Sequence, residues 1–196
     1  MSTIGQFSED GTLKGGTTGQ ILTKNSATDG DYSWANAAGG GGGSGGKVLQ
    51  RVYAAGGSNV SGTANLLADN SIPQNTEGTE FMTISITPQS ATSILVVRFS
   101  GWFGLSAAGF QYGAGIFRDS TADAIAASTV YAADVWGAQH MECVANVASG
   151  STTATTFKFR AGGQGGAAMH MSQTYASALM FSTAQKSFME IWEVEV

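Results

Sequence analysis

The sequence predicts an all-β fold, in which a two-sheet sandwich over residues 47–196 follows an extended N-terminal segment. Two observations support this expectation. Apolar and polar residues beyond position 47 alternate with a period of two rather than the ~3.6 of a helix. Gly, Ser, Asn and Thr interrupt this alternation at short intervals, as they do between the strands of a sandwich, and about eight strands are expected.

The clearest strands can be placed in order along the chain. Within 82–87 the even positions are apolar and the odd ones are Thr or Ser, which predicts a half-buried strand that Pro88 ends. Residues 94–97 are apolar on both faces and therefore predict a central strand. Residues 115–126 predict a hairpin with a Ser-Thr turn in its middle.

The other strands have less regular patterns. The Ala-rich stretch 131–147 has the composition of a helix but neither a clear cap nor an apolar stripe, so we expect strands and loops there. Residues 188–196 begin apolar on both faces and predict a long final strand. Further strands are predicted at 47–53, 155–160 and 169–171.

Three segments follow from the composition along the chain. Residues 1–38 are polar, residues 39–46 contain only Gly and Ser, and residues 47–196 carry the hydrophobic signal. The middle segment predicts a flexible linker with an r.m.s. span of roughly 15 Å. It lacks the preceding strand and following helix that a phosphate-binding glycine loop requires.

The overall composition favours a self-associating structural protein over a free enzyme. Charged residues make up 12% of the chain, about half of the ~25% usual for soluble domains. So few charges do little to keep copies apart, and the 28 glycines suit close strand packing. The net charge of −5 and the scattered basic residues argue against a nucleic-acid partner, because phosphate binding needs clustered Lys and Arg.

Export signals and membrane segments are not expected. The start of the chain, 1–5, lacks both a basic region and an apolar core. No apolar run approaches the ~20 residues needed to span a bilayer. We therefore expect synthesis in a cytoplasm, without membrane insertion.

Few residues are candidates for chemistry, and we expect no cofactor, no metal site and no catalytic residue. His140 and Cys143 offer two metal ligands, whereas a structural zinc site uses four, so we expect a partly buried histidine beside an inert core thiol. No Gly-x-Ser-x-Gly motif accompanies His170, which lies between two methionines and is expected to face solvent or a neighbouring subunit.

Paired carboxylates are the alternative source of activity, because they hydrolyse glycosidic bonds. Two of the candidates flank the predicted Ser-Thr turn, where Asp commonly bonds local backbone, and that role is the favoured one. The candidates are Asp119, Asp123, Asp134 and Glu142.

The N-terminal segment carries a motif with a recognisable likeness. Residues 14–26 read Lys-Gly-Gly-Thr-Thr-Gly-Gln-Ile-Leu-Thr-Lys-Asn-Ser, and Asp-Tyr-Ser-Trp-Ala follows at 31–35. This combination resembles a short module of bacteriophage tail-fibre and head-fibre proteins. The resemblance implies that this segment attaches the chain to another virion protein. The candidate anchoring residues are Ile21, Leu22, Tyr32 and Trp34, although the two aromatic residues can instead pack against the base of a trimer.

A second likeness covers the C-terminal part. The segments 72–78, 86–96, 117–119, 155–162 and 187–191 are similar to C-terminal domains of phage tail and virion proteins with jelly-roll heads of the tumour-necrosis-factor type. That resemblance implies a jelly-roll sandwich, a homotrimer and binding of a host-surface glycan. The chain lacks the long shaft of many such fibres, so a short spike is expected.

Together these observations predict a virion structural protein that is assembled in the host cytoplasm and displayed on the particle surface. Core packing or subunit contact is the common use of aromatic residues. If a glycan site exists, its candidate contact residues are Tyr131, Asp134 and Trp136. Two alternatives stay open: a capsid decoration or head fibre without an essential receptor role, and a polysaccharide-degrading tailspike.

Overall fold

The computed structural model describes residues 17–18, 20–28, 31–36, 46–56, 60–135, 137–176, 178–182 and 184–196. Contacts divide the chain into two units, 1–45 and 46–196. In these described ranges every regular element is a β-strand and the pairings are antiparallel, which confirms the predicted all-β fold. The same ranges contain no helix that is long and apolar enough to cross a membrane. The predicted linker, apart from Gly46, lies outside them.

The N-terminal unit contains a hairpin that the sequence did not indicate. Its strands are β1 (Gln20–Lys24) and β2 (Tyr32–Asn36), and the register pairs Leu22 with Trp34. Asn25 and Asp31 close the hairpin through backbone and side-chain hydrogen bonds. An isolated two-stranded hairpin is marginally stable in water, and among the described residues of this unit none is buried in a core.

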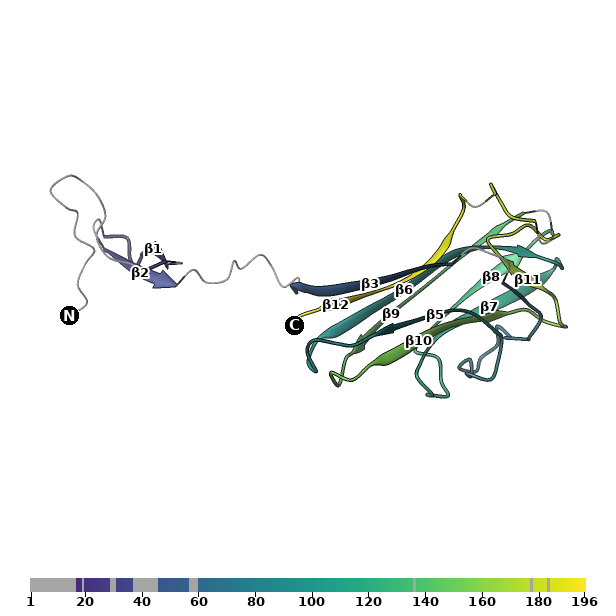
Figure 1. Cartoon of the computed structure of the whole chain (residues 1–196), viewed down its shortest axis with the longest axis horizontal. Coiled ribbons are helices and arrows are strands. Elements are labelled where there is room, and N and C mark those ends of the chain that lie inside the picture. Colours follow the sequence, from purple (N-terminus) through teal and green to yellow (C-terminus); the bar gives the residue numbers. More distant parts are fainter. Residues whose placement is uncertain are drawn as a thin grey trace. The chain divides into compact units, whose positions relative to one another are not determined.

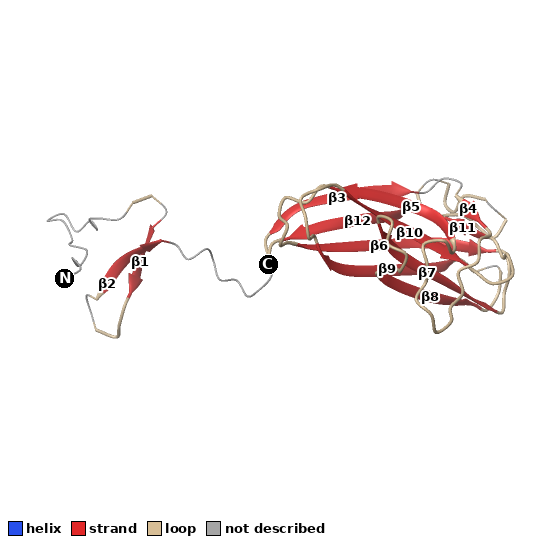
Figure 2. Cartoon of the chain, turned by 90° about the horizontal axis from the view of Figure 1, so that it is seen from below, coloured by secondary structure: helices blue, strands red, loops and turns tan. Residues whose placement is uncertain are grey.

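The C-terminal unit consists of two sheets of antiparallel strands, and the strand axes of the two sheets are roughly aligned (Figures 1 and 2). Sheet I contains, in spatial order, β3 (Val48–Gly56), β12 (Ser187–Val194), β6 (Ile94–Leu105) and β9 (Gln139–Ala148). Two short strands, β11 (Met169–Met171) and β4 (Ser61–Gly62), continue the sheet lengthwise along β6, past the ends of β12 and β3. Sheet II contains β5 (Thr79–Ile86), β10 (Thr155–Gly162), β7 (Phe110–Arg118) and β8 (Ala126–Ala132).

The strand pairing identifies the fold as a jelly roll. The longer strands form four nested antiparallel pairs, β3–β12, β5–β10, β6–β9 and β7–β8. The head is therefore one long antiparallel ribbon, from first strand to last, wrapped over two sheets. The predicted jelly-roll-like sandwich is confirmed in this unit.

Aromatic rings from both sheets meet in the centre of the sandwich. Phe99 of β6 stacks on Phe159 of β10 with ring centroids 3.5 Å apart. Phe103 contacts Phe159 and, edge to face, Phe81 of β5. All four rings are buried. Since each ring lies at an inward-facing position of its strand, the alternation that predicted the strands also built this core.

The predicted hairpin at 115–126 differs in detail from the structure. Strands β7 and β8 do pair, with Ile116 opposite Ala126, but residues 119–125 form a loop rather than a two-residue turn. Asp123 in that loop bridges to Gln74, whose Nε2 donates to the Asp123 carboxylate at 2.9 Å. The loop is thus held by a distant segment, which local turn signals do not reveal. The prediction of strands and loops for 131–147 is confirmed by β8, β9 and the described part of their connection.

Candidate functional site

The outer face of sheet I is unusually rich in aromatic and aliphatic side chains. On β12, Met189 and Ile191 point into the core, so the alternate positions Phe188 and Trp192 point outward. The neighbouring strands add further outward-facing apolar side chains. We call this surface the aromatic face, and it comprises Val48, Tyr53, Val96, Trp102, Val144, Phe188 and Trp192.

Several members of the aromatic face are largely exposed. The exposed fractions are 51% for Tyr53, 48% for Val144 and 40% for Trp102. The Tyr53 ring stacks on Phe188 with centroids 5.7 Å apart, and the Arg51 guanidinium lies 5.0 Å from the ring centres of both Tyr53 and Trp192. These contacts hold the rings in place while one side of the surface remains open to solvent.

A row of alternating charges crosses the aromatic face. Arg51 donates two hydrogen bonds to one oxygen of Glu190, at 3.0 and 2.7 Å, and Arg98 lies 3.7 Å from the other oxygen. Arg98 also donates to Glu142 at 2.7 Å. Glu190 is only 6% exposed, so its charge is compensated by the two arginines rather than by water. Each charge in the row has an opposite neighbour within the chain.

The outer face of sheet II is different in character. Its β5 and β10 positions carry polar and charged side chains, including the hydrogen-bonded pair Ser85 and Thr156 and the ion pair of Lys158 with Glu80. The loop before β5 covers another part of this face, where its Leu66 side chain packs on the strands and is only 1% exposed. A Cβ at Gly113 or Gly162 would collide with this loop, so glycine is required at both positions. Over β5, β10 and β7 the outer face of sheet II is therefore polar or covered, with Tyr131 of β8 exposed at its edge, whereas several apolar side chains lie together on the open face of sheet I.

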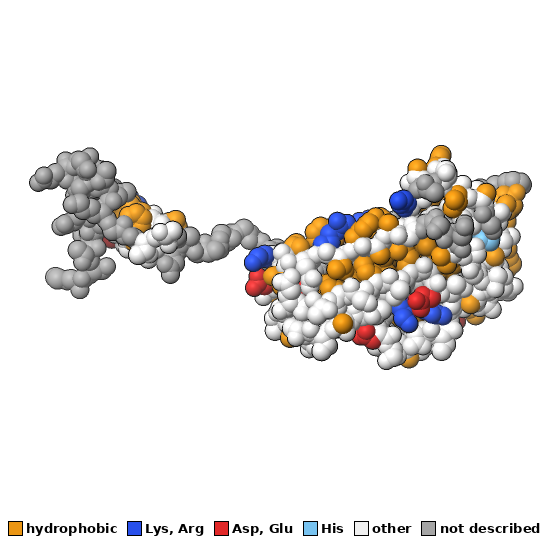
Figure 3. Space-filling view, viewed as in Figure 1, with side chains coloured by type: hydrophobic (Ala, Val, Ile, Leu, Met, Phe, Trp, Pro, Cys, Tyr) orange, Lys and Arg blue, Asp and Glu red, His pale blue; other side chains and the backbone are white. Residues whose placement is uncertain are grey.

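Hydrophobic surface also reaches one edge of the sandwich. Figure 3 shows a band of hydrophobic side chains between the edge strands β3 and β5. Val52 and Ala54 of β3 are partly buried there, and Met82 and Ile84 of β5 belong to the core. A seam of buried and partly buried apolar side chains therefore runs along this edge of the sandwich.

One end of the aromatic face adjoins a groove of about 450 Å³. Trp102, Met180 and Phe181 line it, and Phe181 is 82% exposed. The groove belongs to an excursion, residues 172–186, between β11 and β12, which occupy successive places along β6. Buried hydrogen bonds between Ser172 and Ser187 close the base of this excursion.

The excursion explains why the expectation for His170 was wrong. His170 was expected to face solvent or a subunit neighbour, but it is only 8% exposed. Residues of the excursion lie over Gly104, the register partner of His170, and cover this part of the sheet. The imidazole Nδ1 is hydrogen-bonded to Ser61 at 2.7 Å, and burial lowers the pKa of His170.

The structure separates the two potential metal ligands on β9. Cys143 is buried, and burial raises the pKa of its thiol to about 11. His140 was expected to be partly buried but is exposed, with its ring 5.0 Å from Trp102 and its Nε2 hydrogen-bonded to Ser100. The odd spacing places the two side chains on opposite faces of the strand. In the part of the chain that the structure describes, no three His, Cys, Asp or Glu residues are grouped to hold a metal ion.

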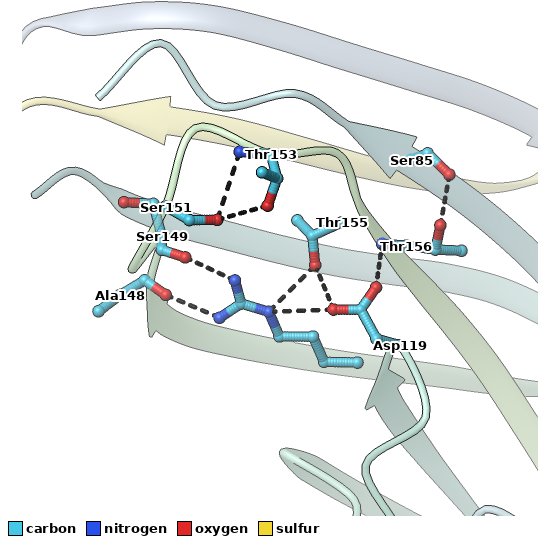
Figure 4. Close-up of polar contacts among 9 residues, drawn as sticks. Ser85, Asp119, Ala148, Ser149, Ser151, Thr153, Thr155 and Thr156 are labelled. Atoms are coloured by element: carbon cyan, nitrogen blue, oxygen red, sulfur yellow. Dashed lines mark hydrogen bonds and ion pairs between the residues drawn. The ribbon is translucent and has the colours of Figure 1, made fainter. Parts of the chain in front are cut away.

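The candidate carboxylates all have structural partners. Figure 4 shows Asp119 accepting hydrogen bonds from Thr155 Oγ1 and the Thr156 backbone N–H, both at 2.8 Å. Arg118 lies beside it and donates to the carbonyls of Ala148 and Ser149. This cluster fastens the end of β7 to the connection between β9 and β10. Of the other three, Asp123 bonds Gln74, Glu142 bonds Arg98, and Asp134 accepts from the Gly137 N–H.

The predicted contact residues can be placed only in part. Leu22, Tyr32 and Trp34 share one face of the N-terminal hairpin, whereas Ile21 lies on the other and is 51% exposed. Tyr131 is 58% exposed on β8, and Asp134 is exposed in the following loop. Trp136 lies outside the described residues. Their roles in anchoring and receptor contact stay predictions.

The aromatic face was missed at the level of the sequence. Its signal was the final strand, which begins apolar on both faces even though it forms part of a two-layer fold with one solvent side. Apolar residues on both faces are typical of a strand that is covered on both sides.

Comparisons with known proteins identify no family. No protein-family model matches the chain, and no curated protein matches it. Among solved structures, the chain is similar to one in the "Structure of infectious bursal disease virus Gt strain", with a TM-score of 0.35 and 12% sequence identity. The match covers 97% of this chain and 46% of that chain, so this chain spans less than half the length of the viral one.

Proposed function

We propose that this chain is a non-enzymatic structural protein of a bacteriophage particle that self-associates as a homotrimer through the aromatic face. The N-terminal unit anchors the chain to another virion protein, and the head is presented to a glycan of the host surface. The observation that carries the proposal is the group of exposed aromatic and aliphatic side chains on the outer face of sheet I, whereas β5 and β10 of sheet II carry polar side chains and the Leu66 loop covers Gly113 and Gly162.

The composition of the aromatic face supports its burial by further copies of the chain. Centres of protein interfaces are enriched in Tyr, Trp, Phe and Arg, and the aromatic face with Arg51 and Arg98 contains all four types. The charges within it are already paired, so a second apolar surface can approach without leaving an unpaired charge.

The apolar edge supports a ring rather than a face-to-face dimer. Each copy carries two different hydrophobic surfaces, the aromatic face and the band along β3 and β5 (Figure 3). When the edge of one copy packs on the face of the next, the contact is head-to-tail, and such contacts form a ring where the rotation between copies closes. The resemblance to trimeric heads supports three copies.

The N-terminal hairpin supports the anchoring role. Leu22, Tyr32 and Trp34 share one face of a hairpin whose described residues include no buried core. Because isolated hairpins are marginally stable, docking of this face on a virion protein would stabilise it.

The oligomeric state tests the central part of the proposal. Size-exclusion chromatography with light scattering is expected to give the mass of three 20.0-kDa chains. Val144→Glu, in the aromatic face, is expected to give monomers, whereas Ile72→Glu, at a 56% exposed loop position outside it, is expected to leave the trimer intact. A monomeric wild-type chain at high micromolar concentration would overturn the proposed assembly.

Immunogold electron microscopy of the particles tests the location. Label at the tail, together with an antibody that blocks adsorption to the host, is the expected result. Label spread over the capsid, with adsorption unaffected, would instead identify a decoration protein. Cleavage of host polysaccharide by the purified chain would contradict the non-enzymatic assignment.

A further inference from the structure

A cavity of about 210 Å³ lies on the outer side of sheet II. One wall is the loop that precedes β5, and the other is formed by β7 and the edge strand β8. The loop contributes Leu67, Asp69 and Ser71, and the edge strand contributes Ala127 and Thr129. The cavity lies at β7 and β8, away from both the aromatic face and the β3–β5 edge that the proposed trimer uses, so trimer formation leaves it available.

The fold holds both walls in place. Leu66 inserts over Gly113 and Gly162 at one end of the loop. At the other end, Asn75 donates hydrogen bonds to the carbonyls of Ser120 and Thr121, which belong to the loop between β7 and β8. A loop tied at both ends keeps its shape without ligand, and such preorganisation lowers the entropic cost of binding.

The polar groups of the cavity suit a ligand with hydroxyl groups. Oδ1 of Asp69 accepts hydrogen bonds from the Ser71 N–H at 2.7 Å and the Ser71 hydroxyl at 2.6 Å. Within the described chain Oδ2 has no partner and is free to accept. These bonds from Ser71 also lower the pKa of Asp69, which is therefore a carboxylate at neutral pH. The Thr129 hydroxyl donates to the Tyr112 carbonyl and keeps its lone pairs for an acceptor role.

An exposed aromatic side chain lies beside the cavity, just outside its lining and on the same strand as Thr129. Tyr131 follows Thr129 on the same face of β8, about 7 Å along the strand, and is 58% exposed. Leu67, at 41% exposed, lies on the opposite wall. Sugar rings present C–H faces to such side chains while their hydroxyls reach acceptors at the side.

We propose that this cavity, with Asp69, Thr129 and Tyr131 as its contact residues, binds a neutral hexose unit of a glycan. No Lys or Arg lines it among the described residues, so an acidic sugar would meet the Asp69 carboxylate without compensation. The inference rests on the glycan-binding part of the proposed function. It differs from the contact site expected at 131–136, because Asp69 replaces Asp134 as the carboxylate.

Saturation-transfer-difference NMR on the full chain tests this site. The probes are the methyl glycosides of glucose, galactose and mannose, with glucuronic acid and N-acetylneuraminic acid as the acidic set. At least one neutral sugar is expected to bind with a Kd on the order of millimolar, and the acidic set is expected to bind at least tenfold more weakly. Preference for the acidic sugars would overturn the proposal.

Matched variants locate the binding. Asp69→Asn and Tyr131→Ala are each expected to weaken binding at least tenfold, whereas Asp134→Asn is expected to leave it unchanged. Circular dichroism and thermal melting confirm that each variant is folded. If Asp134→Asn abolishes binding and Asp69→Asn does not, the site is elsewhere and the inference fails.

The trimer mass, measured on the same samples, separates the two proposals. A trimer that binds none of the sugars overturns this cavity site and leaves the self-association intact. A monomer that still binds a neutral sugar through Asp69 overturns the proposed trimer and leaves the cavity site intact.

Discussion

The two sheets of the head are alike on their inner faces and opposite on their outer faces. Inside, both contribute Phe, Ile and Met side chains to one core. Outside, most of sheet II carries polar pairs such as Ser85 with Thr156 or is covered by the Leu66 loop, with Tyr131 exposed on its edge strand, whereas sheet I groups Tyr53 and Trp102 with other apolar side chains. A jelly roll needs only the inner faces to fold. The difference shows that the inner faces alone account for the core, and the apolar side chains outside sheet I are the basis of the self-association that we propose.

The largest expected effect concerns the cover of sheet II. Leu66→Ala is expected to lower the free energy of unfolding by about 2–4 kcal/mol, because it removes a buried side chain and leaves a cavity. Leu67→Ala, at the adjacent exposed position, is expected to change it by less than ~0.5 kcal/mol. Urea unfolding followed by tryptophan fluorescence measures both. Equal effects of the two changes would mean that sheet II is not covered through Leu66.

The second prediction concerns a buried carboxylate at the end of sheet I. Burial opposes ionisation of Glu193, but hydrogen bonds from the Gln89 N–H, Gln50, Ser93 and the Ser90 N–H outweigh it and lower its pKa to about 2. Glu193→Gln is expected to cost about 2 kcal/mol, because a charge-assisted cap is lost.

The lowered pKa of Glu193 also sets how the free energy of unfolding changes with pH. The folded-state pKa lies below the ordinary glutamate value of 4.5, so the contribution to stability is complete above pH 4.5 and is lost as the pH falls towards 2. Unfolding curves from pH 6 to pH 2 are expected to show a smaller loss of stability in Glu193→Gln than in the wild type. The exposed Glu195→Gln serves as control, and identical pH profiles for all three proteins would contradict the role of Glu193.

The third prediction concerns a variant in which the outer face of sheet I is made more polar, like that of sheet II. Replacing Tyr53 and Val144 with Thr is expected to raise the dissociation constant of the trimer at least ~10-fold, since exposed apolar side chains are removed from the interface. The free energy of unfolding of the dissociated chain is expected to change by less than ~1 kcal/mol. Analytical ultracentrifugation gives the first quantity and urea unfolding the second. A large loss of monomer stability without dissociation would assign the aromatic face to folding instead.

The smallest effect concerns the inner face of sheet II. The Ser128 hydroxyl is the one buried side-chain polar atom of the described residues without a hydrogen-bond partner. Its register partner Ala114 belongs to the core, which places Ser128 on the inner face. Ser128→Ala is expected to raise the free energy of unfolding by up to ~1 kcal/mol, because a desolvated hydroxyl is removed. Destabilisation on thermal melting would show that the hydroxyl has a partner after all.

Short-range patterns were enough to predict much of the head. The alternation at 82–87 corresponds to β5. The run 94–99, whose first residues are apolar on both faces, corresponds to β6, which pairs with β12 on one side and β9 on the other. The hairpin at β1 and β2 was not predicted, because its pairing depends on short segments with few apolar residues. The candidate sugar site was even harder to predict from the sequence. Asp69 and Thr129 are far apart along the chain, and the Leu66 loop brings them to one cavity.

By itself, the sequence determined the all-β class and the approximate position of most strands, because a period of two is a local property of neighbouring side chains. The tertiary structure alone decided which strands pair, which outer face stays open, and that the excursion at 172–186 buries His170. Those outcomes depend on contacts between residues far apart in the chain. Strand periodicity separates the two faces of a strand but does not say what covers either of them.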